Sequence, residues 1–278
     1  GNTYYPLEQL KEELLIKAEI DNTLANTAIN TLLKKKAIIL TKDKHGNEIC
    51  YIKEIYSAEN FCTLKLKNIS SQKVIEKTKI SEDLLIPYLE KRSSIKFSKK
   101  QIDAILLAIK SRILIITGGP GTGKTTVLNG ILATFKRLDY KIEVCAPTGR
   151  ATKKLEEVTG NSARTIHRLL EYSPKQLEFI KNSNNQLKID CLVVDEVSMI
   201  DINLLASLLE ALPNNVKIIF VGDEDQLPSI GPGNVLKDLI ESSVIDVVVL
   251  KEIFRQKEES MIVHIASLIK DGQLPNFD

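Results

Sequence analysis

The 278-residue sequence has no tryptophan, and aromatic side chains make up only 5% of it. Its four cysteines are far apart and form no C-x-x-C pair, which argues against a zinc site or a disulfide framework and favours a reducing, cytoplasmic location. No apolar run approaches the length of about 18 residues that a membrane span needs, so no membrane partner is expected. The formal net charge is only +2, so any grip on nucleic acid must come from local patches.

One glycine-rich stretch, LIITGGPGTGKTTVLNGIL (114–132), lies between an apolar run and an apolar-striped helix. The spacing Gly118-x-x-x-x-Gly123-Lys124-Thr125 is the Walker A pattern in a strand–loop–helix context. Such a loop points consecutive backbone N–H groups at one anion, and the helix N-terminus adds its dipole. The predicted nucleotide-phosphate site consists of Gly118, Gly119, Pro120, Gly121, Thr122, Gly123, Lys124, Thr125 and Thr126.

Residues 96–278 alternate apolar runs with helical patterns. Near-continuous Val/Ile/Leu runs of this kind predict an α/β fold, with a parallel sheet covered by helices on both faces. A ligand is then expected beyond the C-terminal ends of the strands. The predicted strands are residues 113–117, 142–147, 191–196, 216–222 and 244–250.

Residues 1–95 form a separate predicted unit, which ends in a polar boundary at residues 91–98. Helical spacing over residues 7–19 and 22–36, followed by a β-hairpin over 37–55, is typical of a small winged-helix-like domain. Two further helices are expected, at 58–70 and 81–91. Such a domain binds DNA or packs against a neighbour, and the sequence leaves both readings open.

Polar side chains follow three of the predicted strands. Beside a Walker A motif, Asp195 is suited to a Mg²⁺ partner and Glu196 to a group that activates water. Gln226 follows the next strand end, where an amide can contact both a γ-phosphate and the attacking water. Arg255 comes after the fifth strand and offers a planar donor for transition-state charge.

Together these segments resemble superfamily 1 helicases, most closely the RecD-like group of superfamily 1B. The resemblance covers roughly residues 96–272 and implies a RecA-like motor domain that uses ATP and Mg²⁺ and binds single-stranded DNA. The matching stretches are GGPGTGKTT (118–126), APTGRAT (146–152), TIHRLL (165–170), VVDEVSMID (193–201), GDEDQLPSIGPGNVL (222–236) and IFRQ (253–256).

The resemblance also implies roles for single residues. Gln101, in FSKKQIDAI, matches the glutamine that reads the adenine edge. Lys124 and Thr125 match the residues that hold phosphate and metal, while Gln226 and Arg255 match the γ-phosphate sensor and a phosphate-contacting arginine. Residues in segments that touch the DNA backbone in relatives are Thr148, Arg150, Thr165 and His167. For the histidine, a hydrogen-bonded core position is an equal alternative.

The run Leu227-Pro228-Ser229-Ile230 has no aromatic residue on which bases could stack, which fits the 5′-to-3′ subgroup. The family motor has two RecA-like domains, so this sequence is expected to be an N-terminal fragment that does not unwind DNA alone. The leading hypothesis is a helicase motor of DNA recombination or repair, with subunits of a recombination nuclease complex as candidate partners. The alternatives are a nucleotide-gated module that holds DNA or a partner without unwinding, and a P-loop ATPase with a non-nucleic-acid target.

Overall fold

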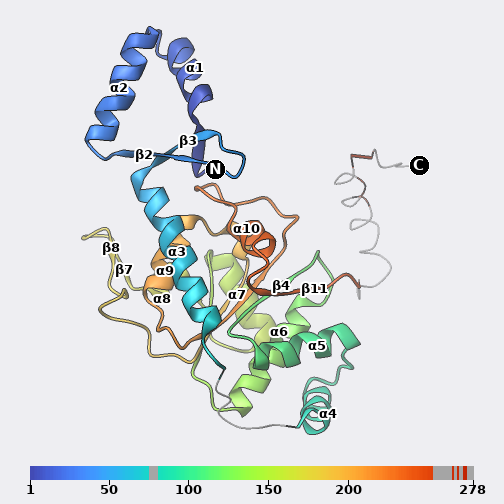
Figure 1. Cartoon of the computed structure of the whole chain (residues 1–278). Coiled ribbons are helices and arrows are strands. Elements are labelled where there is room, and N and C mark those ends of the chain that lie inside the picture. Colours follow the sequence, from blue (N-terminus) through green and yellow to red (C-terminus); the bar gives the residue numbers. More distant parts are fainter. Residues whose placement is uncertain (75–80, 253–264, 266–267, 269–271, 274–278) are drawn as a thin grey trace.

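The computed structural model describes residues 1–74 and 81–252, together with residues 265, 268, 272 and 273 (Figure 1). Within this part, a six-stranded sheet runs through the larger half of the chain in the order β11-β4-β10-β9-β5-β6. All of its strand pairs are parallel. The strands are β4 (Ile113–Thr117), β5 (Ile142–Ala146), β6 (Arg164–Thr165), β9 (Cys191–Val194), β10 (Lys217–Gly222) and β11 (Asp246–Val249).

Alternate residues of the central strands enter two separate apolar clusters, one on each face of the sheet. In β4, Ile113 and Ile115 pack in one cluster, while Leu114 and Ile116 pack in the other. The first face is covered by α3 (Lys53–Ser71), α9 (Ile202–Glu210) and α10 (Val235–Glu241). The second is covered by α4 (Glu82–Ser93), α5 (Lys99–Lys110), α6 (Lys124–Arg137) and α7 (Gly149–Thr159). The predicted α/β fold with helices on both faces is therefore confirmed.

A small antiparallel sheet, in the order β1-β3-β2, forms the N-terminal unit with two helices at the top of Figure 1. Its elements are β1 (Tyr4–Pro6), α1 (Leu7–Lys17), α2 (Asn22–Lys34), β2 (Ile38–Lys42) and β3 (Glu48–Ile52). The hairpin turn is stabilised by Asp43, whose carboxylate accepts hydrogen bonds from the backbone N–H groups of His45 and Asn47. The two helices and the hairpin expected from the sequence are present.

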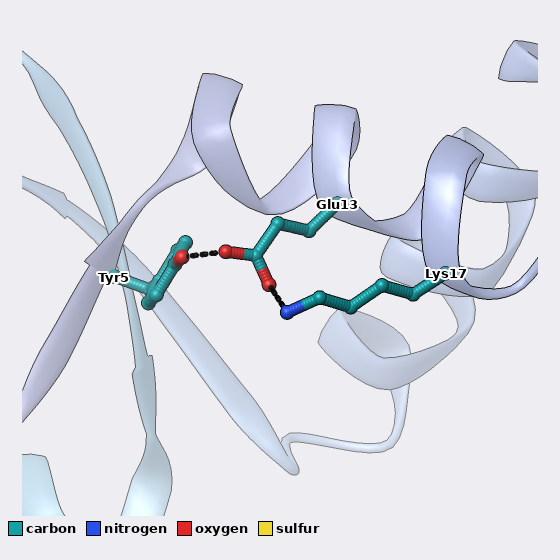
Figure 2. A network of polar contacts seen from close by, with 3 residues as sticks. All are labelled: Tyr5, Glu13 and Lys17. Carbon is teal, nitrogen blue, oxygen red and sulfur yellow. Dashed lines mark hydrogen bonds and ion pairs between the residues drawn. The ribbon is translucent and has the colours of Figure 1, made fainter.

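A polar network on the surface links β1 to α1 in this unit (Figure 2). The Tyr5 hydroxyl donates to one carboxylate oxygen of Glu13, and the Lys17 ammonium donates to the other at 2.5 Å. These two donors lower the pKa of Glu13, with Lys17 as the larger cause. Because the network is solvent-exposed, it orients the helix but contributes little to stability.

Two helices that precede residue 95 pack on the six-stranded sheet, and the first of them also contacts the N-terminal unit through Tyr56 and Tyr51. The strand β3 ends at Ile52, so the hairpin is shorter than the sequence predicts. The first helix, α3, begins at the next residue, Lys53. Its residues Cys62, Leu66 and Ile69 are buried in the same cluster as α9. The helix α4 likewise buries Leu85 and Leu89 in the cluster on the other face. The domain boundary at residue 95 stays a prediction.

A buried lysine fixes α5 against the sheet. Lys217 of β10 is 1% exposed, and its ammonium donates to the carbonyls of Ala108, Ile109 and Ser111 at 3.2, 2.8 and 2.5 Å. A cation is favourable at a helix C-terminus, where carbonyl groups lack intrahelical partners. The contact holds α5, the helix that carries Gln101.

No helix in the described part of the chain is both long and apolar enough to cross a bilayer.

Candidate nucleotide-binding site

The loop between β4 and α6 is built from glycines in conformations that other residues rarely adopt. Gly118, Gly121 and Gly123 have φ angles of 154°, 78° and 83°. Gly123 is the N-cap of α6, so the helix begins at Lys124 with its first backbone N–H groups facing the loop. This is the backbone cradle that the Walker A spacing predicts.

Gly118 has no room for a side chain. A Cβ atom there would lie 2.4 Å from the carbonyl oxygen of Leu250, in addition to the positive φ. We expect Gly118→Ala to lower the free energy of unfolding by about 1–3 kcal/mol from backbone strain alone. The control is Gly119→Ala, since a Cβ at Gly119 meets no atom within 4 Å. Equal chemical denaturation curves for the two variants would contradict the inference that a side chain at Gly118 strains the backbone.

Lys124 extends back over the loop. Its ammonium donates to the carbonyls of Gly118 and Gly119, the second at 3.0 Å. Burial lowers its pKa, and the carboxylates of Asp223, Glu196 and Asp195 oppose that shift. The loop therefore holds a partly desolvated cation, which a phosphate group would stabilise.

Two adjacent carboxylates follow β9. The backbone N–H of Asp195 donates to the Cys145 carbonyl at 2.9 Å, and the N–H of Glu196 donates to the Asp195 carboxylate at 2.9 Å. Glu196 has a φ of 53°, a left-handed conformation that costs a non-glycine residue roughly 1–2 kcal/mol. Burial raises the pKa of Asp195, so its charged form is destabilised without a cation beside it. Strain and burial of this kind cluster at functional sites.

One cavity joins these groups. It lies between the glycine loop, the helices α6 and α7, and the ends of β9 and β10. Strand register explains the meeting, because Thr117 pairs with Gly222 and Phe220 pairs with Val194, which sets the C-terminal ends side by side. The lining residues are Gly119, Pro120, Gly121, Thr122, Gly123, Lys124, Thr125, Thr126, Leu128, Lys154, Leu155, Val158, Asp195, Glu196, Val221 and Gln226.

Gln101 does not line this cavity. It is 3% exposed and sits at the third position of α5, where its side-chain oxygen accepts from the Ser98 backbone N–H at 3.0 Å. The Ser98 hydroxyl accepts in turn from the Gln101 backbone N–H at 3.4 Å, which completes a capping box. The side chain thus has a structural role in starting α5, and the adenine contact stays a prediction.

The four candidate DNA-binding residues lie near the same edge of the sheet. In the β5–β6 pair, Ala146 lies opposite Thr165, so Thr165 ends β6 beside the end of β5, and Thr148 follows β5. The hydroxyl of Thr148 accepts from the first turn of α7, and that of Thr165 from the first turn of α8 (Ile166–Leu169). Each hydroxyl still has its proton to donate to a phosphate oxygen. Arg150 is exposed in the first turn of α7.

His167 is exposed, so the alternative of a core histidine is wrong. Its ring lies 5.7 Å from that of Tyr172 and 5.6 Å from that of Phe179, between ring centroids. Tyr172 and Phe179 are 5.2 Å apart and come from the two-stranded sheet of β7 (Tyr172–Ser173) and β8 (Glu178–Phe179). Sequence reasoning missed this aromatic cluster, because only the pairing of β7 with β8 brings Phe179 beside Tyr172 and His167.

Four further polar residues were also missed near the strand ends. Asp223 is 3% exposed, accepts from the Asp225 backbone N–H at 3.1 Å, and is the carboxylate with the largest influence on Lys124. Among the residues that the structure describes, the buried hydroxyls of Thr117 and Ser198 have no hydrogen-bond partner. Lys154 enters the cavity from α7. Thr117, Ser198 and Asp223 lie in stretches singled out from the sequence, whereas Lys154 lies just beyond one of them. Arg255 lies outside the described residues.

The chain is similar in sequence to several known proteins. A family model described as an AAA domain matches residues 101–232. The chain is 35% identical over 195 residues to the ATP-dependent RecD2 DNA helicase of Deinococcus radiodurans. The matched region covers 70% of this chain and 26% of that protein. It is also similar to RecBCD enzyme subunit RecD of two Buchnera aphidicola subspecies. The identities are 41% over 166 residues and 32% over 249 residues, covering 51% and 82% of this chain.

Among solved structures, Pif1 helicase from Candida albicans has a TM-score of 0.50 and 24% identity, over 66% of this chain and 46% of that one. This likeness shows the fold alone. The chain spans 26%, 28% and 38% of the lengths of the three sequence relatives. By its motifs, its fold and these relatives, the chain belongs to the RecD-like helicases of superfamily 1B.

Proposed function

We propose that this chain is the ATP-binding motor part of a DNA helicase. The observation that carries the proposal is the single cavity in which the glycine loop, Lys124, the Asp195–Glu196 pair and Gln226 meet. Each of these groups has a distinct use in nucleotide hydrolysis, and the same arrangement has no use in a purely structural domain. The printed name of the Deinococcus relative, an ATP-dependent DNA helicase, supports the same activity.

The residues present fit a magnesium ion shared with the nucleotide. The Thr125 hydroxyl and the Asp195 carboxylate are hard oxygen donors that line one cavity. The described residues contain no cluster of three or more His, Cys, Asp or Glu side chains that would form a closed metal cage. Mg²⁺ usually keeps waters and completes its shell with substrate phosphates, which suits two protein donors. When bound, the ion would neutralise charge on the β- and γ-phosphate oxygens.

The chain's own residues then divide the hydrolysis between them. Lys124 and the loop N–H groups bind the β- and γ-phosphates. Glu196 accepts a proton from the water whose oxygen attacks the γ-phosphorus, and ADP leaves as the bond to its β-phosphate oxygen breaks. Gln226 contacts both the water and the γ-phosphate. Arg255 is proposed to stabilise transition-state charge, as its place in the motif implies.

We infer further that the DNA substrate is single-stranded and that translocation runs 5′ to 3′. The run after Gln226 supports this direction, because Leu227 and Ile230 are 87% and 102% exposed and neither offers a ring for stacking. The relatives named as RecBCD subunits support other nuclease subunits as partners. Since the chain spans about a quarter to two fifths of these relatives, unwinding is proposed for a protein of their length. For these 278 residues we propose nucleotide binding, with slow hydrolysis and no unwinding.

The adenine contact of Gln101 can be separated from its capping role. Gln101→Ala removes the capping acceptor and should cost stability in the range of about 0.5–2 kcal/mol known for helix caps. Gln101→Glu restores an acceptor at this position but lacks the amide N–H donor. We expect thermal unfolding of the Glu variant to lie closer to wild type, while both variants lose the preference for ATP over GTP. Retained preference in the Glu variant would remove Gln101 from the adenine site.

The DNA contacts of Arg150 and His167 should differ in their response to salt. Each phosphate neutralised on a single strand contributes about −0.7 to the slope of log affinity against log salt. Arg150→Ala should weaken binding of an oligothymidine and make that slope shallower by about 0.7. His167→Ala should weaken binding at every salt concentration without changing the slope, because the exposed His167 ring offers a surface on which bases stack. Fluorescence anisotropy over a salt series measures both effects.

The same titration tests the proposed function. Binding that depends on nucleotide and falls with salt supports the motor and excludes an ATPase with a non-nucleic-acid target. A second measurement separates a helicase from a nucleotide-gated module that does not unwind DNA. In a protein of the relatives' length, single-stranded DNA should stimulate the ATP hydrolysis of a helicase but not that of such a module. Affinity for DNA that is unchanged by salt would contradict a grip led by phosphate contacts.

A further inference from the structure

The helix α7 is shared between the two proposed sites. It begins after Thr148, and Arg150 lies in its first turn. Three later residues of the same helix, Lys154, Leu155 and Val158, line the nucleotide cavity. Because residues four apart are neighbours on a helix surface, Arg150, Lys154 and Val158 form one continuous stripe. One face of α7 therefore runs from the candidate DNA segment into the nucleotide cavity.

Lys154 brings a second positive charge to this cavity. Its side chain is exposed, and it forms no ion pair with any residue that the structure describes. Lys154 and Lys124 thus place two ammonium groups at one cavity, which the Asp195 carboxylate also lines.

Two ammonium groups that face one cavity repel each other, and an anion between them relieves that repulsion. The glycine loop and the start of α6 surround Lys124, whereas Lys154 enters from α7. On the proposed function, Glu196 and Gln226 act at the terminal phosphate, and both share the cavity with Lys154. A flexible lysine is suited to bind phosphate as a point charge.

We propose that Lys154 binds the γ-phosphate of ATP opposite Lys124 and links the nucleotide to the helix that carries Arg150. The proposal rests on the proposed function, since it assigns a second cation to the same site. Loss of the γ-phosphate on hydrolysis removes the anion that holds Lys154. Because Arg150 lies one turn earlier on the same face, a shift of α7 on release of Lys154 also moves the DNA contact.

The chain supplies a matched control in the neighbouring residue. Lys153 carries the same charge, lies on the same helix and is also exposed, but it does not line the cavity. We would compare Lys154→Met and Lys153→Met by calorimetric titration with a non-hydrolysable ATP analogue and with ADP, both with Mg²⁺. A lost charge-assisted contact should lower the affinity of Lys154→Met for the ATP analogue about tenfold, and for ADP less than about twofold. Lys153→Met should bind both nucleotides like wild type, and Lys154→Arg should restore affinity for the analogue.

A second readout tests the link to DNA. Wild type and Lys153→Met should change their affinity for oligothymidine when ADP replaces the ATP analogue, and Lys154→Met should lose that difference. Equal nucleotide affinities for the two Met variants would overturn the proposal, as would an equal loss for ADP and the analogue. Tighter analogue binding by Lys154→Met would also overturn it, because Lys154 would then compete with Mg²⁺ for the carboxylates. Failure of wild type to bind either nucleotide is a different result, which contradicts the proposed function itself.

Discussion

Replacing Lys124 with alanine should lower the affinity for Mg·ATP by roughly two orders of magnitude or more. The ammonium is the charged donor at the glycine loop, and hydrogen bonds to charged groups are worth about 1.5–3 kcal/mol each. Two such bonds to the β- and γ-phosphates correspond to about 3 kcal/mol or more, and each 1.4 kcal/mol is about tenfold in affinity. Calorimetric titration with ATP and Mg²⁺ measures the loss.

The control for this variant lies on the same helix. Lys136 is exposed in the last turn of α6, at the opposite end from the loop. Lys136→Ala should remove a favourable contact with the helix C-terminus, worth about 0.3–1 kcal/mol of stability, and leave nucleotide affinity unchanged. If Lys124→Ala bound Mg·ATP as tightly as Lys136→Ala, the glycine loop would not be the phosphate site.

Asp195→Asn should make the ligand-free chain more stable near neutral pH while it removes the contribution of Mg²⁺ to ATP affinity. Burial raises the pKa of Asp195 in the folded state. A group of this kind contributes stability below its unfolded pKa, and that stability is lost as the pH rises through the folded value. Above that value the buried carboxylate is a net cost, which asparagine avoids. The Asn side-chain oxygen can still accept the hydrogen bond from the Glu196 backbone N–H.

Thermal unfolding across a pH series tests the first half of this prediction. The melting temperature of Asp195→Asn should exceed that of wild type at pH 7, and the gap should close as the pH falls to about 4, the ordinary range for aspartate. Titration with ATP in Mg²⁺ and in EDTA tests the second half, since the variant should bind equally in both. Asp103→Asn, at an exposed position of α5, is the control. A lower melting temperature for Asp195→Asn would contradict the assignment of a destabilised metal-binding carboxylate.

The parts of the site that follow from local spacing could be read from the sequence. The Walker A loop and the Asp195–Glu196 pair each lie within a few residues of a strand end, and parallel strands bring such ends together. The buried strands were also predictable, because their Val/Ile/Leu runs are nearly continuous. β6 was not, since two residues are too few to form a pattern.

Features that depend on tertiary packing could not be read in this way. α3 contains the residues expected to end a strand, and its burial against α9 depends on contacts more than a hundred residues away. Gln101 matched a family position, yet its capping role needs the local geometry at Ser98. Lys154 and Lys153 are equivalent as sequence, and only the fold places one of them in the cavity.

A crystal structure of the chain with a non-hydrolysable ATP analogue and Mn²⁺ would test the central claim most directly. Mn²⁺ replaces Mg²⁺ among oxygen ligands and gives an anomalous signal that locates the ion. We predict phosphate density in the glycine loop within hydrogen-bond distance of the Lys124 ammonium, and an anomalous peak between the Thr125 hydroxyl and the Asp195 carboxylate. Nucleotide bound elsewhere, or a metal peak away from these two oxygens, would contradict the account.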